Sequence, residues 1–391
     1  MEDFKAKMRE NFEMSDLGKL SYYLGIEVKQ RPHSITLNQA GYAEKILEKL
    51  GMAECKPCRV PMDTRVKLSK SEESPPVDAT LYRSAIGSLI YLVNTRPDLA
   101  YSVGMVSRFM EAPTTKHLAA VKQILRYVKG TLHHGCNYNK VEEEEFKLVG
   151  YSDSDLARDV DDRKSTTGVI YFLSQSPVTW ISQKQKVVAL SSCEAEYIAA
   201  TTGTCQGTWI SRLLHELIGW KTNKFELRVD NKSAIALTKN PVYHNRSKHI
   251  HIKFHFLREC VQRGEVEVEY VQTEEQLADI LTKPLSRDKI NELSMMIRIE
   301  DKEECSHSIK ENGFSEICCK AVGGRRARQG LLQNYSRSES SAKSAAELQQ
   351  VGARQDLLQS HWRSKLGSCV HLLLGDQIKR LQEINLSAYT G

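Results

Sequence analysis

The order of strand-like and helix-like segments between residues 142 and 291 constrains the fold more than any other feature of this sequence. The segments FKLVGYSD, GVIYFLSQ and PVTWISQ are short, strand-like and separated by turn residues, as strands joined by hairpins are. Further along, the strand-like FELRVDN and EVEVEYVQ alternate with segments of helical composition. Hairpins followed by strand–helix alternation favour an α/β fold, a mixed five-stranded sheet flanked by helices.

Four helices are expected beside these strands. They cover residues 194–219 and 233–239, the segment HIHIKFHFLRECVQRG, and the final segment EEQLADILTK. Gly203 and Gly207 weaken the first helix, because glycine is unfavourable in a helix interior. Thr273, followed three residues later by Gln276, predicts a capping box at the start of the last helix.

The chain on either side of this central part has a different composition. Residues 1–145 carry alternating helix and strand signals, interrupted by an extended connector with four prolines between residues 57 and 76. The segment KHLAAVKQILRYVKG predicts an amphipathic helix with a basic outer surface. Residues 296–391 have few aromatic side chains and no sustained strand pattern, so we expect a largely disordered or loosely helical tail there.

Composition excludes some classes of protein. No apolar run approaches the roughly 18 residues that span a bilayer, so no membrane partner is expected. The first residues, MEDFKAKMRE, are too charged for a secretory signal, which favours an intracellular protein. A net charge of +6 is compatible with a polyanionic partner but does not by itself indicate one. Cys55 and Cys58 form the one C-x-x-C pair, for which reduced thiols are favoured over a metal or redox site.

Four acidic residues lie in the expected strands and helices at positions where a carboxylate is locally unfavourable: Asp153, Glu196, Asp230 and Asp279. Asp153 and Asp230 end two of the expected strands, and Glu196 lies on a helix whose other face is apolar. Alone, Asp230 could cap the next helix, Glu196 could face solvent, and Asp279 could be an ordinary surface residue. The choice of Asp153 over Asp155 stays open, because the strand end could shift by two residues. A polar turn explains a further set of acids: Asp155, Asp159, Asp161 and Asp162.

Taken together, the four acids predict a metal site. Two strand ends and two helices would supply four carboxylates, with no cysteine or histidine at the spacing of a zinc site. Oxygen ligands favour Mg²⁺, or Mn²⁺, over zinc. Two such ions about 3.5–4 Å apart can activate a water and stabilise the leaving oxygen of a phosphodiester.

The same residues carry a family resemblance. YSDSDLARDVDDRKSTTGVIYFL, VTWISQKQKVVALSSCEAEYIAA, RVDNKSAIALTKNPVYHNRSKHIHIKFHFLRE and TEEQLADILTKPL resemble the ribonuclease H domain of copia-type LTR retrotransposon Pol polyproteins. FEMSDLGKLSYYLGIEV and YRSAIGSLIYLVNTRPDLAYSVGMVSRFMEAPTTKH resemble the C-terminal palm, thumb and connection part of that family's reverse transcriptase. The resemblance implies a truncated reverse transcriptase at 1–145, a ribonuclease H-like domain at 146–295 and an unassigned tail at 296–391.

The resemblance also implies an activity. Asp153, Glu196, Asp230 and Asp279 would be the catalytic metal ligands for Mg²⁺-dependent hydrolysis of the RNA strand in RNA–DNA hybrids. The hybrid is the expected partner, and the missing half of the reverse transcriptase is a further candidate. Action in a cytoplasmic virus-like particle is implied, with the nucleus left open. Candidate nucleic-acid contacts are basic or polar: Arg163, Lys164, Lys184, Asn231, Ser233, Arg246 and Lys248.

The sequence departs from the family pattern in two places that bear on activity. The polymerase signature of a tyrosine, any residue and two aspartates is absent, so DNA polymerase activity is not expected from this chain. The loop before Asp279 also lacks the histidine found in many cellular ribonucleases H. Two alternatives therefore remain: an inactive retroelement relic that at most binds nucleic acid, and a transposase or integrase built on a similar sheet.

Overall fold

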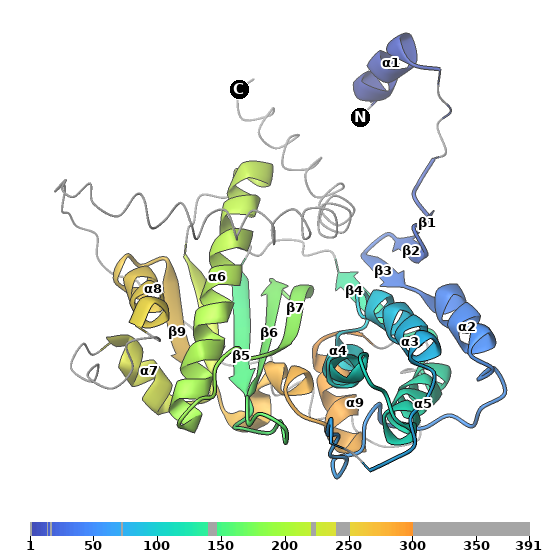
Figure 1. The fold of residues 1–391 in the computed structure, drawn as a ribbon. Coiled ribbons are helices and arrows are strands. Elements are labelled where there is room, and N and C mark those ends of the chain that lie inside the picture. The colour runs from blue at the N-terminus through green and yellow to red at the C-terminus, as the bar shows by residue number, and fades with distance from the viewer. Residues whose placement is uncertain are drawn as a thin grey trace, which may run out of the picture. The chain divides into compact units, whose positions relative to one another are not determined.

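The computed structural model describes residues 2–299, apart from 14, 16–17, 72, 140–146, 220–223 and 240–250. The predicted disordered tail therefore lies outside the described residues from position 300 onward, and so do Arg246 and Lys248. The described residues form two β-sheets with helices around them (Figure 1). Among these residues, no helix has both the length and the apolar composition of a membrane span.

The first sheet belongs to the N-terminal part of the chain. Its four strands are antiparallel and stand in the order β1-β2-β3-β4. Their bounds are β1 Tyr22–Tyr23, β2 Ile26–Arg31, β3 Ser34–Asn38 and β4 Gly135–Asn139. The last described residues return to this sheet, because the backbone N–H of Asn137 donates to the carbonyl oxygen of Arg298 at 3.0 Å.

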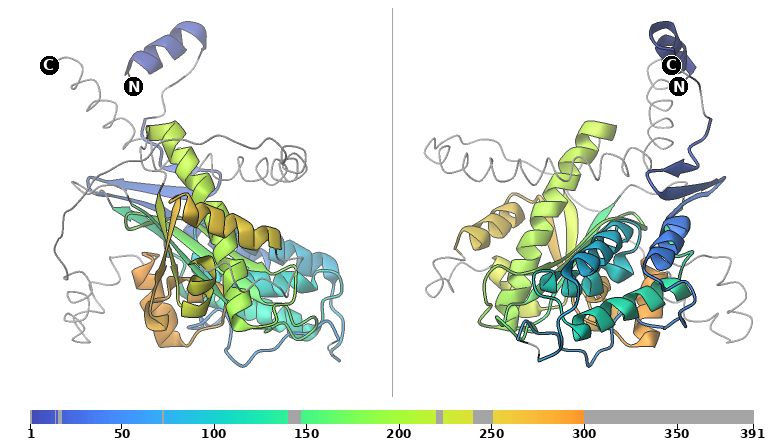
Figure 2. Two further views of the ribbon diagram at one scale, coloured as in Figure 1. Left: turned by 90° about the vertical axis from the view of Figure 1, so that its left-hand side faces the viewer. Right: turned by 45° about the vertical axis from the view of Figure 1, so that its right-hand side comes forward.

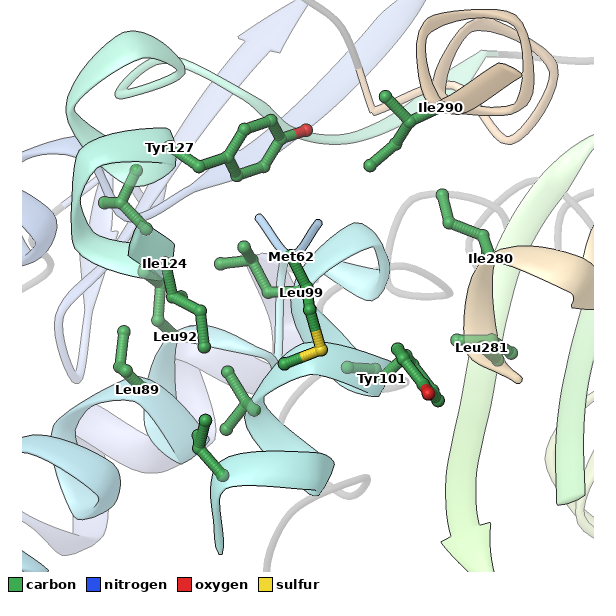
Figure 3. Packing of buried hydrophobic residues seen from close by; sticks show 14 of the residues in the cluster. Met62, Leu89, Leu92, Leu99, Tyr101, Ile124, Tyr127, Ile280, Leu281 and Ile290 are labelled. Carbon is green, nitrogen blue, oxygen red and sulfur yellow. The ribbon is translucent and has the colours of Figure 1, made fainter. Parts of the chain in front are cut away.

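The helices of this N-terminal part, apart from α1, pack against one another. They are α1 Glu2–Asn11, α2 Ala40–Lys49, α3 Ala79–Leu92, η1 Pro97–Leu99, α4 Ala100–Val106, η2 Ser107–Phe109 and α5 Thr115–Gly130. Leu89 and Leu92 of α3 pack with Ile124 of α5 in a buried cluster (Figure 3). The cluster continues through Ile280 and Leu281, so the N-terminal helices and the later part of the chain share one hydrophobic core.

The second sheet confirms the predicted α/β fold with a mixed five-stranded sheet. Its order is β7-β6-β5-β8-β9; β5, β6 and β7 run antiparallel, whereas β5, β8 and β9 run parallel. All five strands fall on the segments expected from their polarity pattern. Their bounds are β5 Leu148–Ser154, β6 Thr166–Leu173, β7 Ser176–Lys184, β8 Phe225–Val229 and β9 Val266–Tyr270.

The two faces of this sheet are covered by different elements. Helix α6, Ser192–Ile218, lies along one face, and the segment carrying η5, Leu277–Leu281, and α9, Arg287–Met296, lies on the opposite side (Figure 2). Tyr171 points to the α6 face, where its hydroxyl donates to the carbonyl oxygen of Gly203 at 2.9 Å. Tyr151 and Phe172 point to the other face and join the shared core. Helices α7, Lys232–Lys239, and α8, His251–Gln262, pack beside α6.

The glycines that weaken α6 as an isolated helix are what allow it to pack closely on the sheet. A Cβ atom at Gly207 would lie 2.3 Å from the ring of Phe225 and 2.4 Å from the hydroxyl of Tyr171. No side chain fits in that space without displacing the helix. Glycine at position 207 therefore lowers the helix propensity of α6 but allows the helix to lie close to the sheet.

We expect Gly207→Ala to lower the free energy of unfolding by about 1–3 kcal/mol, because the added methyl group must push α6 away from the sheet. Urea unfolding followed by circular dichroism measures this loss. The matched control is Gly87→Ala in α3, where nothing lies within 4 Å of the added Cβ. That control should gain up to about 1 kcal/mol from helix propensity, and equal losses in both variants would contradict the packing account.

The final predicted helix and its capping box are wrong. The segment forms two short 3₁₀ helices instead, η4 Thr273–Glu275 and η5 Leu277–Leu281, and α9, Arg287–Met296, follows. Gln276 lies between them in an extended conformation, and its side-chain amide donates to the carbonyl oxygen of Ser152 at 2.9 Å. Because that side chain is committed to the sheet, it cannot cap Thr273, and the local helix signal yields to a tertiary contact.

Candidate active site

Asp153 is the penultimate residue of β5, and its side chain is almost completely buried, with 2% of the residue exposed. The strand holds its backbone in register opposite Gly168 of β6. The hydroxyl of Thr282, just after η5, donates to Asp153 Oδ2. Residues from three different segments thus fix the orientation of this carboxylate.

Glu196 reaches the same place from the first turns of α6. Ser191 caps the helix, its hydroxyl oxygen accepting from the backbone N–H of Glu194 at 3.2 Å. Glu196 Oε1 accepts from the backbone N–H of Ser154 at 3.0 Å, which joins the start of α6 to the end of β5. Within the described residues, the other oxygen, Oε2, is buried and has no hydrogen-bond partner.

Asp230 follows directly after β8, the parallel neighbour of β5. The register pairs Ser152 with Val229, so the next residues of both strands, Asp153 and Asp230, emerge side by side. Parallel strands bring their carboxyl ends to one sheet edge, where ligand sites are common in open α/β sheets. Asp230 Oδ2 accepts from the hydroxyl of Thr273 at 3.3 Å.

The structure brings Asp153, Glu196 and Asp230 together as a three-carboxylate cluster. One oxygen from each residue lies within 4.8 Å of those from the other two. Burial raises the pKa of Glu196 to about 10, and the charges of Asp153 and Asp230 add to this effect. Burial and the nearby Asp153 also raise the pKa of Asp230. The cluster thus concentrates negative charge that a cation would relieve.

Asp155, the alternative to Asp153, is directed elsewhere. Its Oδ1 accepts from the backbone N–H of Thr166 at 2.6 Å, which ties it to the start of β6. Burial raises the pKa of Asp155 to about 6. The geometry therefore groups Asp153, and not Asp155, with Glu196 and Asp230.

Asp279, the fourth predicted ligand, lies next to the cluster on η5 and has a partner that the sequence did not indicate. Lys283 Nζ is 2.8 Å from Asp279 Oδ1 and 3.8 Å from Asp153 Oδ2. Burial raises the pKa of Asp279 to about 7, with Asp153 contributing, although Lys283 opposes the shift. Asp279 is therefore paired with an ammonium group instead of being part of the three-carboxylate cluster.

A buried amide outside the acid set also holds the site together. Gln185 Nε2 donates to Ser154 Oγ, to Thr167 Oγ1 and to the carbonyl oxygen of Ala195, at 3.0–3.1 Å. It thereby connects the end of β5, the start of β6 and the first turn of α6. Nothing in the local sequence marks Gln185, because its partners lie 10 to 31 positions away.

The candidate nucleic-acid contacts have varied surroundings. Lys184 Nζ lies 2.6 Å from Asp159 Oδ2 and 2.8 Å from Asp162 Oδ1, so acids from the expected polar turn already hold its charge. Lys164 pairs with Asp162 at 3.2 Å. The side chain of Asn231 accepts from the backbone N–H of Ala234 at 3.0 Å, at the start of α7. Two of the candidates are exposed: Arg163 and Ser233.

Comparison with known proteins identifies relatives of this chain. Residues 1–64 match the family model described as reverse transcriptase (RNA-dependent DNA polymerase). The chain is 42% identical over 292 residues to a retrovirus-related Pol polyprotein from transposon RE1 of Arabidopsis thaliana, covering 75% of this chain and 20% of that protein. It is 40% identical over 294 residues to the polyprotein from transposon TNT 1-94 of Nicotiana tabacum, covering 73% and 22%.

A solved structure gives a weaker comparison. The N-terminal RNase H domain of a Mycobacterium tuberculosis protein aligns with 39% of this chain and 98% of that chain. The two are 11% identical with a TM-score of 0.28, too low to add to the fold description above.

The mixed five-stranded sheet and its flanking helices define an α/β domain. Over about three quarters of its length the chain is similar to Pol polyproteins of retrotransposons, as its sequence motifs predicted. It spans about one fifth of the length of the polyproteins that it matches.

Proposed function

We propose that this chain hydrolyses the RNA strand of RNA–DNA hybrids with the help of a divalent metal ion held by the three-carboxylate cluster. The observation that carries the proposal is Glu196 Oε2, a buried carboxylate oxygen that has no hydrogen-bond partner in the part of the chain that the structure describes and that is grouped with Asp153 and Asp230. A buried polar oxygen without a partner is costly unless a ligand satisfies it.

The cluster has the ligand chemistry of a hard cation. All its donors are carboxylate oxygens, which suit Mg²⁺ or Mn²⁺. When bound, such an ion supplies Lewis-acid stabilisation of a phosphodiester and lowers the pKa of a water molecule. The raised pKa of Glu196 supports the same assignment, because a nearby positive charge would return this carboxyl to its ionised form.

The chain's own residues prepare this site. The hydroxyl of Thr282 donates to one oxygen of Asp153, and the backbone N–H of Ser154 donates to one oxygen of Glu196. Both carboxylates are therefore oriented before any ligand binds. Asp153 and Glu196 are 2% and 6% exposed, and this burial limits competition from water. Asp230 is more exposed than the other two carboxylates. Rigid positioning of this kind is what a metal-dependent hydrolase needs.

The choice of substrate is supported by the family. A polymerase that copies RNA into DNA produces an RNA–DNA hybrid, and the polymerase family model matches the same chain at residues 1–64. A nuclease domain in the same polypeptide, if it removes the RNA strand, would act on the product of the polymerase. Discrimination from a DNA duplex would use the 2′-hydroxyl groups of the RNA strand.

The proposal is tested by incubating the purified full chain with a labelled hybrid in Mg²⁺, beside single-stranded RNA and double-stranded RNA of the same sequence. We expect cleavage of the hybrid alone, products with 3′-hydroxyl and 5′-phosphate ends, and complete loss in EDTA. Salt-dependent binding of the hybrid without any product would instead assign the chain to nucleic-acid binders. Equal cleavage of all three substrates would exclude the proposed specificity.

A further inference from the structure

A lysine lies against the acidic cluster in the position of a counter-ion. Lys283 Nζ is 2.8 Å from Asp279 Oδ1 and 3.8 Å from Asp153 Oδ2, so its ammonium group bridges the two carboxylates. Both carboxylates are buried, while the Lys283 side chain is 31% exposed. Partial burial strengthens such a pair relative to one on the open surface.

The fold fixes the backbone that carries this lysine. The N–H of Lys283 donates to the carbonyl oxygen of Asp279 at 3.2 Å, which sets the two side chains on the same side of the turn. Gly168 of β6 allows this turn to approach the sheet, because a Cβ there would lie 2.6 Å from Thr282 Cγ2 and 2.9 Å from Leu281 Cβ. The position of the ammonium group is thus a product of tertiary packing.

Lys283 is also partly enclosed. It lines a small pocket together with apolar and polar residues of the N-terminal region and of α9, among them Met62, Tyr101, Ser102 and Ile290. Its side chain is 31% exposed, so its charge is less solvated than that of a lysine on the open surface.

We propose that the Lys283 ammonium group takes the place of a second metal ion between Asp153 and Asp279, so that the site holds a single divalent cation. This inference rests on the proposed metal-dependent function and replaces the two-ion arrangement expected from the sequence. In this account Asp153 contacts both cations. Glu196 and Asp230 are the other ligands of the divalent ion, and Asp279 is the other partner of the Lys283 ammonium group.

Charge balance favours this arrangement. When all four carboxylates are ionised, one divalent ion together with one ammonium group neutralises three of their four negative charges. A second divalent ion would bring the site to a net positive charge and would lie within a few ångströms of the ammonium group. Like charges at such distances repel strongly in a partly buried site. Lys283 thus acts as a positioning residue that directs the divalent ion to the three-carboxylate cluster.

The test counts bound metal ions instead of reaction product. Mn²⁺ is titrated into the full chain, and the bound ions are counted by calorimetry and by the paramagnetic resonance signal of free Mn²⁺. We expect about one ion per chain for the wild type and about two for Lys283→Gln, since the vacated position regains the ligands of a second ion. Lys122→Gln is the matched control, because this lysine is exposed on α5 and the same charge is removed.

Two further variants keep the outcome interpretable. Lys283→Arg retains the charge and should still bind about one ion, whereas Asp230→Asn should lose most of the binding. Two ions on the wild type, or one ion on a folded Lys283→Gln with unchanged affinity, would overturn the inference while leaving the metal site in place. No ion on the folded wild type would overturn the proposed metal-dependent function itself.

Discussion

Replacing Arg96 with methionine is expected to lower the free energy of unfolding by about 3–5 kcal/mol, because it leaves the carboxylate of Asp98 buried without its partner. Arg96 is 1% exposed. Its guanidinium group donates to both oxygens of Asp98, at 3.0 and 2.7 Å, and to the carbonyl oxygen and hydroxyl of Thr131, both at 2.7 Å. It also lies over the ring of Tyr127, 5.7 Å from its centroid.

The pKa of Asp98 gives the sign of the pH dependence. Burial alone would raise this pKa, but the charge of Arg96 and its hydrogen bonds outweigh burial and hold the pKa below its ordinary value. A carboxyl with a depressed pKa in the folded chain stabilises the fold above its unfolded pKa of about 3.9. That stabilisation is lost as the pH falls through the lower, folded-state value.

Urea unfolding at neutral pH measures the effect of Arg96→Met. The matched control is Arg263→Met just after α8, which removes an exposed pair with Glu259 whose side chains are 58% and 52% exposed; it should lose only about 0.3–0.5 kcal/mol. A double variant, Arg96→Met with Asp98→Leu, should recover much of the loss, because no unpaired charge remains. Equal losses for Arg96→Met and Arg263→Met would show that the buried pair does not stabilise the fold.

Asp153→Asn is expected to lower the rate of hybrid hydrolysis by about 100-fold or more while raising the melting temperature of the metal-free protein. A metal contributes several kcal/mol of charge stabilisation, and each 1.36 kcal/mol is about tenfold in rate. Asp153 raises the pKa of Glu196 and of Asp279, behind burial in both cases, so its charge repels theirs. Removing that charge relieves the repulsion, and an asparagine oxygen can still accept from Thr282.

The two readouts are the initial rate of cleavage in Mg²⁺ and the melting temperature in EDTA. Asp288→Asn, the same substitution at an exposed position in the first turn of α9, is the control and should change neither strongly. Loss of activity together with a large fall in melting temperature would indicate that Asp153 is needed for folding instead. An Asp153→Asn rate within about threefold of the wild type, less than 1 kcal/mol in barrier, would remove Asp153 from the site.

Local patterns in the sequence were sufficient for the sheet and for the position of the acids within it. The polarity pattern of residues 148–184 gives three strands, and the strand–helix alternation that follows gives two more. Asp230 follows from this interpretation, and Asp153 follows apart from the choice between it and Asp155, because a residue at the end of one parallel strand lies beside its counterpart on the next. The helix carrying Glu196 was also predicted, within two residues at its start.

The same reasoning could not predict contacts between residues that lie far apart in the sequence. Gln276 looked like part of a helix cap, yet its amide contacts Ser152, 124 positions earlier in the chain. Lys184 looked available for phosphate, yet it is paired with Asp159 and Asp162. Lys283 could not be distinguished from a surface lysine. In each case the partner is set by tertiary packing, which polarity patterns and motif spacing do not encode.

Cleavage of one RNA–DNA hybrid, with a different label on each strand, tests the central claim most directly. The full-length wild type and Asp230→Asn would be compared in Mg²⁺, after circular dichroism shows that both are folded. The account predicts that the wild type cuts the RNA strand and leaves the DNA strand intact, and that Asp230→Asn cuts neither. An intact RNA strand with the folded wild type, or equal cutting by both proteins, would contradict it.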